Sequence, residues 1–329
     1  MARRKTKTVN LALQGGGAHG AFTWGVLDRV LEEEALEIEG ISATSAGAMN
    51  AAALKSGLVR GGSREAAKET LDSFWRSVSR SSPGLPNPLL EWVRAWDPTT
   101  PNIADAIEAG ARWGMGDALT RMFSPYDLNP FNINPLRDLL VKQLDFDAVC
   151  EGEGPDLFIC ATNVRTGKAR VFRGNEINSE AILASTCLPT VFQAVEIDDP
   201  RTGRREAFWD GGYTGNPALW PLFYETRSCD VIIVHINPIT REDAPYTARE
   251  ILNRVNEVGF NSALMGELRA VNFARRLIAE GRIPEGAMKA VLIHSVADDE
   301  TMRQLGAATK MSPDWTLLQN LKEAGRTAM

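Results

Sequence analysis

Two short segments near the N-terminus have the residue types of an acyl-transfer site. The first is Gly15–Gly20, with the sequence GGGAHG, which follows a short apolar run. Glycines let the backbone turn sharply and approach a ligand, and N–H groups at a helix N-terminus attract negative charge. The segment therefore suits an anion. His19 is expected close to the same site, where it either contacts substrate or forms a local hydrogen bond at the helix start.

The second segment, Ala43–Gly47, has the sequence ATSAG and places Ser45 in a predicted strand-to-helix turn. Small neighbours let the backbone fold tightly around the serine, as in a nucleophile elbow. The usual GxSxG pattern has glycine two positions before the serine, where this chain has Ala43. If the turn required positive φ there, Ala43 would be strained. The N–H of Ala46, directly after the serine, is a candidate donor to a developing oxyanion.

A third segment supplies a carboxylate. Asp210 precedes two glycines in Trp209–Gly212 (WDGG), after the charged stretch Asp198–Glu206, which we interpret as a turn. The aspartate either faces a site from an open turn or belongs to a plain surface turn. An ordinary aspartate, with a pKa of about 3.9, is a poor base at neutral pH. If Asp210 is a base, we expect burial beside an apolar pocket to raise its pKa.

The elements that must position these segments alternate between strand and helix. Strands are predicted at Val9–Leu13, Ile38–Ala43, Leu157–Thr162, Ala169–Arg173, Val231–Ile236 and Ala290–Ser295, and helices at Ala18–Glu34, Ala46–Ser56 and Ala248–Gly281. Most of these strands are dense in apolar residues, which is typical of a parallel sheet covered on both faces. The expected fold class is therefore α/β, with a central, mostly parallel sheet and helices on both faces. A helical insertion is expected at about 75–135, and the C-terminal part is expected to be helical.

Together the segments resemble the patatin-like phospholipase family of the bacterial type. The matching text is LALQGGGAHGAFTWGVLDRVLEE, ISATSAGAMNAAAL, STCLPTVFQAVEI and FWDGGYTGNPALWPL, in that order. The resemblance implies a single patatin-like acyl hydrolase domain over residues 1–329, built as an α/β/α sandwich. Its motif-bearing core spans about 9–237, and a C-terminal extension, 240–329, takes no part in the resemblance.

The resemblance also implies a chemistry. Ser45 is the nucleophile of a serine-dependent carboxylic ester hydrolase, a lipase or phospholipase A-type esterase, and Asp210 completes a Ser–Asp dyad. Cleavage of a lipid acyl ester then passes through an acyl-enzyme. The expected oxyanion hole consists of the glycine loop together with the elbow N–H, namely Gly15, Gly16, Gly17 and Ala46. No metal and no cofactor is expected.

The three histidines fit a dyad better than a triad. His235 lies in VIIVHIN and His294 in AVLIHSV, two apolar segments, so we expect both to be buried structural residues. The alternative is that either side chain emerges at the C-terminal end of its strand, where sites gather in open α/β sheets.

Two other functions compete with ester hydrolysis. Gly15, Gly17 and Gly20 also satisfy GxGxxG, and Glu37 and Glu39 follow about twenty residues on, which is the dinucleotide-binding pattern. That reading leaves the serine elbow and the DGG segment unexplained. The second alternative is a non-catalytic patatin-like protein used for binding or regulation.

Composition sets broad limits on partners and location. A net charge of −6 with 44% hydrophobic residues is that of a globular protein with no general attraction to nucleic acid. Four cysteines without a CxxC pair predict reduced thiols and a cytoplasmic protein. No apolar run approaches the roughly 18 residues of a membrane span. The expected partner is a lipid or other acyl-ester substrate. Whether the arginine-bearing helix from Ala248 contacts a membrane peripherally or packs on its own domain stays open, and no oligomeric state is predicted.

Overall fold

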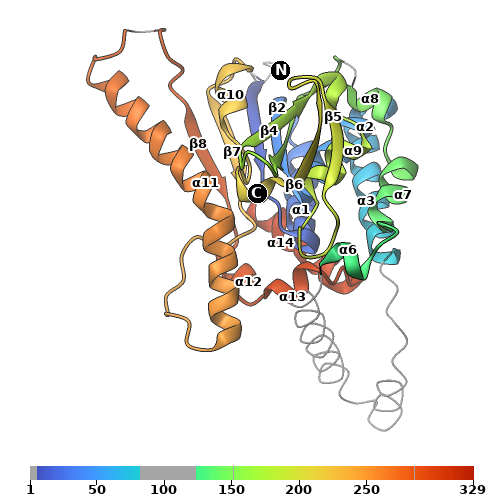
Figure 1. Ribbon diagram of the computed structural model, residues 1–329. Helices are drawn as coiled ribbons and strands as arrows, with labels where there is room; N and C mark the ends of the chain where they lie inside the picture. The colour runs from blue at the N-terminus through green and yellow to red at the C-terminus, as the bar shows by residue number, and fades with distance from the viewer. Residues whose placement is uncertain (1–5, 82–123, 151, 285) are drawn as a thin grey trace.

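The structure, a computed structural model, describes residues 6–81, 124–150, 152–284 and 286–329 (Figure 1). Most of the insertion predicted at about 75–135 lies outside the described residues. Trp75, at the start of the predicted insertion, belongs to helix α3 and is fully buried.

One mixed sheet forms the centre of the described part of the chain. Its strand order is β5-β6-β3-β2-β1-β7-β8, and β4 pairs with the edge of β3 opposite to β6 and β2. The strands are β1 (Lys7–Leu13), β2 (Leu36–Thr44), β3 (Asp156–Asn163), β4 (Ala169–Arg173), β5 (Val195–Asp199), β6 (Arg204–Asp210), β7 (Asp230–Val234) and β8 (Leu292–Val296). The pairs among β3, β2, β1, β7 and β8 are parallel, whereas β4, β5 and β6 pair antiparallel.

Helices cover both faces of this sheet. Before β3 they are η1 (Gly17–Gly20), α1 (Ala21–Glu32), α2 (Ala46–Gly61), α3 (Arg64–Arg80), α6 (Pro125–Leu128), α7 (Pro135–Gln143) and α8 (Phe146–Cys150). After β4 they are η2 (Gly174–Glu176), α9 (Ser179–Ser185), η3 (Gly211–Tyr213), α10 (Trp220–Tyr224), α11 (Ala248–Ala279), α12 (Asp299–Arg303), α13 (Ala307–Lys310) and α14 (Trp315–Ala328). Because alternate residues of a strand face opposite sides, Leu11 and Leu13 join one apolar cluster and Ala12 joins another. The predicted α/β sandwich is confirmed.

The hairpin β5–β6 differs from the sequence-based expectation. Asp198–Glu206 was expected to be a turn, but only the residues between Asp199 and Arg204 connect the two strands. Because β5 lies at the edge of the sheet, its charged residues reach solvent and pair across the hairpin, as Glu196 does with Arg205 at 2.8 Å.

One expectation of burial in the C-terminal part is wrong, that of His294. In α11, Leu264 and Val271 are buried, whereas Ile251 and Val255 are exposed, at 45% and 64%. Figure 1 shows α11 extending beyond the sheet at both ends, so one apolar face cannot be covered along its whole length. His294 is not buried either, because β8 is an edge strand; its side chain bonds to Asp230 at 2.7 Å.

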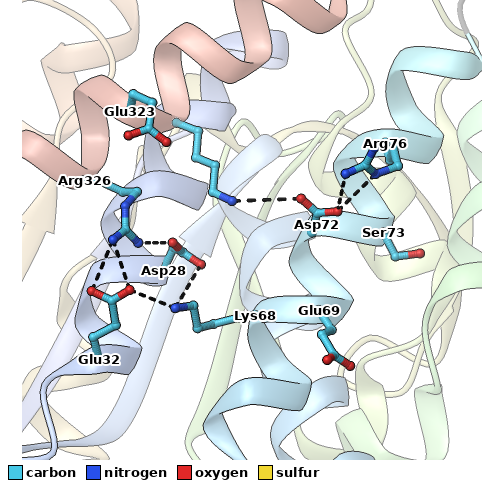
Figure 2. A pocket seen from close by; sticks show the side chains of 10 residues that line it. Asp28, Glu32, Lys68, Glu69, Asp72, Ser73, Arg76, Glu323 and Arg326 are labelled. Atoms are coloured by element: carbon cyan, nitrogen blue, oxygen red, sulfur yellow. Dashed lines mark hydrogen bonds and ion pairs between the residues drawn. The ribbon is translucent and has the colours of Figure 1, made fainter.

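The last helix, α14, is held on α1 by close packing and by charge. A Cβ at Gly25 of α1 would collide with the Lys322 carbonyl, and one at Gly325 would collide with the Phe22 carbonyl, so the two helices touch through their backbones. Figure 2 shows Arg326 and Lys68 each bonded to the carboxylates of Asp28 and Glu32.

These charged side chains line an open groove of about 680 Å³ between α1, α3 and α14. Because acidic and basic side chains of the groove pair with one another, we interpret the groove as a packing contact between the helices.

Two further observations bear on location. No described helix, α11 included, combines the length and the apolar run needed to cross a bilayer. The four cysteines, Cys150, Cys160, Cys187 and Cys229, are free thiols. Peripheral membrane contact stays a prediction.

Candidate active site

The glycine loop and the serine turn lie side by side because they follow neighbouring parallel strands. Leu13, the last residue of β1, pairs with Ala43 of β2, so both connections leave the same edge of the sheet. The contact between them is tight: a Cβ at Gly15 would lie 2.5 Å from the Cβ of Ser45. Only glycine at this position lets the loop approach the serine so closely.

Ser45 has the backbone of a nucleophile elbow. Its φ of 55° and ψ of −122° are strained for a residue with a side chain, and among the described non-glycine residues only Asn132 also has positive φ. Ala43 lies inside β2 without positive φ, so the alanine in place of glycine costs no strain. The turn is held from below: the Ser45 amide donates to Ser185 Oγ at 2.9 Å, and the Ser185 hydroxyl donates to the Cys160 carbonyl at 2.7 Å.

Strand register brings Asp210 to the same place. Thr44 pairs with Cys160 of β3, and the next residue of β3, Ala161, pairs with Asp210 at the end of β6. β2 and β6 pair with the same edge of β3, one after the other, so Ser45, which follows Thr44, meets Asp210 at that edge. Asp210 is fully buried, its amide donates to the Cys187 carbonyl at 2.7 Å, and its Oδ1 accepts from the Gly212 amide at 2.7 Å.

The environment of Asp210 makes it a stronger base than an ordinary aspartate. Burial raises its pKa to about 6, although the Gly212 amide, the Ser45 hydroxyl and the charge of Lys310 each lower it. The second oxygen, Oδ2, is buried and has no hydrogen bond of ordinary length among the described residues. The Ser45 hydroxyl is thus close enough to lower the pKa of Asp210, although Oδ2 accepts no hydrogen bond from the described residues. Hydrogen bonds between catalytic groups are often long before substrate binds.

The glycine loop contains both occupied and free N–H groups. The Gly15 amide donates to Asn216 Oδ1 at 2.6 Å, so it is not available to an oxyanion, and the expected role of Gly15 as a donor is corrected. The amides of Gly16, Gly17 and Ala46 have no acceptor among the described residues. These three remain candidates for the oxyanion hole.

His19 faces the C-terminal part of the chain. It is buried, and its Nε2 lies 2.7 Å from the Thr309 hydroxyl. Burial, together with the charge of Lys310, lowers its pKa to about 3, so the imidazole is neutral. The predicted alternatives were substrate contact or a local hydrogen bond, and the structure instead pairs His19 with a residue 290 positions away.

Neither of the other histidines is bonded to the dyad. His235 is buried as expected, and its Nε2 lies 3.3 Å from the Ser295 hydroxyl; His294 pairs with Asp230. The part of the chain that the structure describes also contains no group of three or more His, Cys, Asp or Glu side chains arranged to hold a metal ion.

The dinucleotide alternative lacks an acid at the required end of the strand. Glu37 pairs with Thr8 in the first half of β2, whereas the glycine loop follows the opposite end of β1, about 20 Å away along the strands. Glu39 accepts hydrogen bonds from the amides of Arg227 and Ser228. Neither carboxylate can reach a ribose bound at the glycine loop.

A supporting network of amides was not identified from the sequence. Gln14 Oε1 accepts from the amides of Ile236 and Asn237, and Asn237 Nδ2 donates to the Gly15 carbonyl at 3.0 Å. Asn216 belongs to the same network, because its Oδ1 accepts from the Gly15 amide. The one available signal was its position four residues after the DGG segment; nothing marked Gln14 or Asn237.

The fold and the serine turn together define an α/β protein of the acyl-hydrolase type. Residues 11–223 match the family described as Patatin-like phospholipase, more than half of the chain, and the chain therefore belongs to that family. Patatin-like phospholipases act on lipid esters, so membership supports lipid hydrolase activity.

Comparisons with other proteins add less. A search of curated protein sequences gave no significant match. Among solved structures, VipD from Legionella pneumophila is similar at 15% identity and a TM-score of 0.36, over 98% of this chain and 67% of VipD. The type III effector protein ExoU is similar at 15% identity and a TM-score of 0.29, over 95% of this chain and 53% of ExoU.

Proposed function

We propose that the chain is a serine-dependent carboxylic ester hydrolase, of the lipase or phospholipase A type, that acts through a Ser45–Asp210 dyad. The observation that carries the proposal is the pairing of a strained elbow serine with a fully buried aspartate that has one oxygen free to take a proton. Strain at a single non-glycine residue is typical of functional sites. Family membership supplies the substrate class, a lipid or other acyl ester.

The proposed reaction has two halves. Ser45 Oγ attacks the ester carbonyl while Asp210 Oδ2 takes its proton, and the protonated carboxyl then gives that proton to the leaving alcohol. In the second half, Asp210 accepts a proton from the water that attacks the acyl-enzyme, and it gives this proton to Ser45 Oγ as the acid leaves. Amides of Gly16, Gly17 and Ala46 would hold the negative oxygen in both halves, and each such donor typically contributes about 3 kcal/mol to transition-state stabilisation.

We also propose that residues 1–329 work as one domain in a reducing, cytoplasmic setting. The backbone contact of α14 with α1 joins the C-terminal extension to the first helix of the core. The four free thiols fit a reducing compartment. Limited proteolysis of the intact chain tests the first point: release of a stable fragment that ends near residue 240 would oppose it.

Hydrolysis of a chain-length series of esters tests the dyad. We expect Ser45→Ala and Asp210→Asn each to lower kcat by at least about 10³-fold, because the nucleophile or its proton acceptor is removed. Ser73→Ala and Asp198→Asn are matched controls at exposed positions and should keep wild-type rates. Wild-type activity in Ser45→Ala would refute the proposal, whereas wild-type activity in Asp210→Asn alone would refute the dyad.

A further inference from the structure

Lys310 is the charged residue of the C-terminal extension that lies against the site. It ends α13, beyond the family match at 11–223, and the segment around it contacts the glycine loop. A Cβ at Gly17 would collide with the Lys310 carbonyl, and the preceding Thr309 bonds to His19. The extension thus packs directly on the loop that carries the candidate oxyanion donors.

The Lys310 ammonium bonds to the amide network that supports this loop. Its Nζ donates to Asn237 Oδ1 at 2.7 Å and to Asn256 Oδ1 of α11 at 3.0 Å. With its oxygen held by Lys310, the Asn237 side chain must direct its Nδ2 to the Gly15 carbonyl, as observed at 3.0 Å. Lys310 therefore fixes the orientation of the Asn237 side-chain amide, and this amide holds the Gly15 backbone next to Ser45.

The same ammonium lies next to the loop that carries the carboxylate. Lys310 Nζ stands 5.6 Å from the centre of the Phe260 ring, and a Cβ at Gly212 would collide with that ring. Lys310 and Asp210 attract each other, since each stabilises the charged form of the other. The lysine thus contacts both halves of the candidate site, the glycine loop through Asn237 and the DGG loop through Phe260.

We propose that Lys310 is a positioning residue of the Ser45–Asp210 site, which orients the glycine loop through Asn237 and favours the ionised carboxylate of Asp210 by its charge. The inference rests on the proposed function and deepens it, because an aspartate can act as the base only when ionised. It also gives the C-terminal extension a role in the reaction.

The other charged and titratable groups around the pair fit this assignment. Lys310 is faced by Glu257 of α11 and His19 of η1. Glu257 already pairs with Arg241 and Arg254, and His19 is neutral. Asp210 is therefore the acid whose ionised form depends most on the charge of Lys310.

Around Asp210 lie further groups that ionise only at high pH. Burial raises the pKa of the thiols of Cys160 and Cys187 to about 12, and it also raises the pKa of the Tyr213 hydroxyl. All three are neutral where Asp210 titrates, so none of them substitutes for Lys310. Burial lowers the pKa of Lys310 itself to about 8, which leaves it charged through the pH range in which Asp210 ionises.

The test is the titration of Asp210 in the full-length chain, followed by ¹³C NMR of labelled aspartate carboxyls, with Asp210→Asn to assign the signal. We expect Lys310→Met to raise the pKa of Asp210 by about half a unit to one unit, because a nearby positive charge is lost. Lys310→Arg keeps the charge and should titrate close to wild type. Lys322→Met, which removes a lysine of α14 that packs over the Trp24 ring, is the matched control and should not move the titration.

The pH profile of kcat/KM on a short ester gives the second readout. The acid limb should move upward in Lys310→Met by the same amount as the carboxyl titration, and the plateau should fall about tenfold because the loop loses its support. An unchanged titration in folded Lys310→Met, or an equal shift in Lys310→Arg, would overturn the inference. If circular dichroism shows that Lys310→Met does not fold, Lys310→Gln replaces it. Since the NMR titration needs no turnover, an inactive wild type would refute the proposed function while the titration still decides the role of Lys310.

Discussion

The motif-bearing core and the C-terminal extension support the same glycine loop by different means. In the core, strand register and backbone contact set the positions: Leu13 opposite Ala43, and Gly15 against Ser45. In the extension, side chains from short helices reach back across the chain, as Thr309 does to His19 and Lys310 to Asn237. The first kind of support follows from local patterns of small residues, whereas the second depends on pairs 290 and 73 residues apart. The glycine loop is therefore held by contacts from outside the family match as well as from within it.

The largest effect should come from the backbone contact in the core. Gly15→Ala places a methyl group 2.5 Å from the Ser45 Cβ, so the nucleophile or the loop must move. Because displacements of about 1 Å can cost 10²-fold in rate, we expect kcat/KM to fall by at least about 100-fold with little loss of folded protein. Gly266→Ala, on α11 with open space around it, is the control and should keep full activity. Full activity in Gly15→Ala would show that the tight contact is not needed.

The buried carboxylate should cost stability, since the burial that raises its pKa disfavours the charged form. Below about pH 3, Asp210 is mostly protonated in both folded and unfolded chains and costs almost nothing. As the pH rises from 3.8 to about 6, the unfolded chain ionises first, so stability falls, and it stays lower above pH 6. Each pH unit in this window is worth about 1.4 kcal/mol, or about 3 kcal/mol in all.

Asp210→Asn removes that cost. We expect its free energy of unfolding to exceed that of wild type by about 2–3 kcal/mol at pH 8 and to come close to it at about pH 3, as measured by urea denaturation at both values. Asp198→Asn, at an exposed position, keeps Asp210 and should be as stable as wild type at both pH values. Equal stability of Asp210→Asn and wild type at pH 8 would contradict the cost of burying this charge.

The smallest effect should come from the contact that holds the extension to the core. Gly325→Ala drives a methyl group into the Phe22 carbonyl, and overpacking of this kind typically costs about 1–3 kcal/mol. We expect about 2 kcal/mol in chemical denaturation, and Gly266→Ala again serves as the helical glycine control. If Gly325→Ala is as stable as wild type, α14 is not packed on α1 as described.

Much of the core could be predicted from sequence because its information is local. Glycines and other small residues at the end of a strand indicate a tight turn. The glycine loop, the turn at Ser45 and the alternation of strand and helix could therefore be predicted. Ala43 looked like a departure, but the positive φ belongs to Ser45 itself, a detail that residue types do not reveal. The hairpin that delivers Asp210 was missed because the charges of an edge strand look like those of a turn.

The rest was hidden because it depends on tertiary contact. No sequence pattern near Gly15 indicates that its amide donates to Asn216, and none near His19 indicates that its hydrogen-bond partner is Thr309. How much of the apolar face of α11 is covered could not be predicted, because periodicity shows where apolar residues lie on a helix, not how far the sheet beneath it extends. Lys310 lies in a stretch without a recognisable motif, so only its contacts mark it.

Labelling with a fluorophosphonate probe, followed by peptide mass spectrometry, tests the central claim most directly. The probe reacts covalently with an activated serine, so we predict a single phosphonyl adduct on Ser45, lost in Ser45→Ala and slowed at least about 100-fold in Asp210→Asn. An adduct on another residue, no adduct on folded wild-type protein, or wild-type labelling of Asp210→Asn would contradict the dyad.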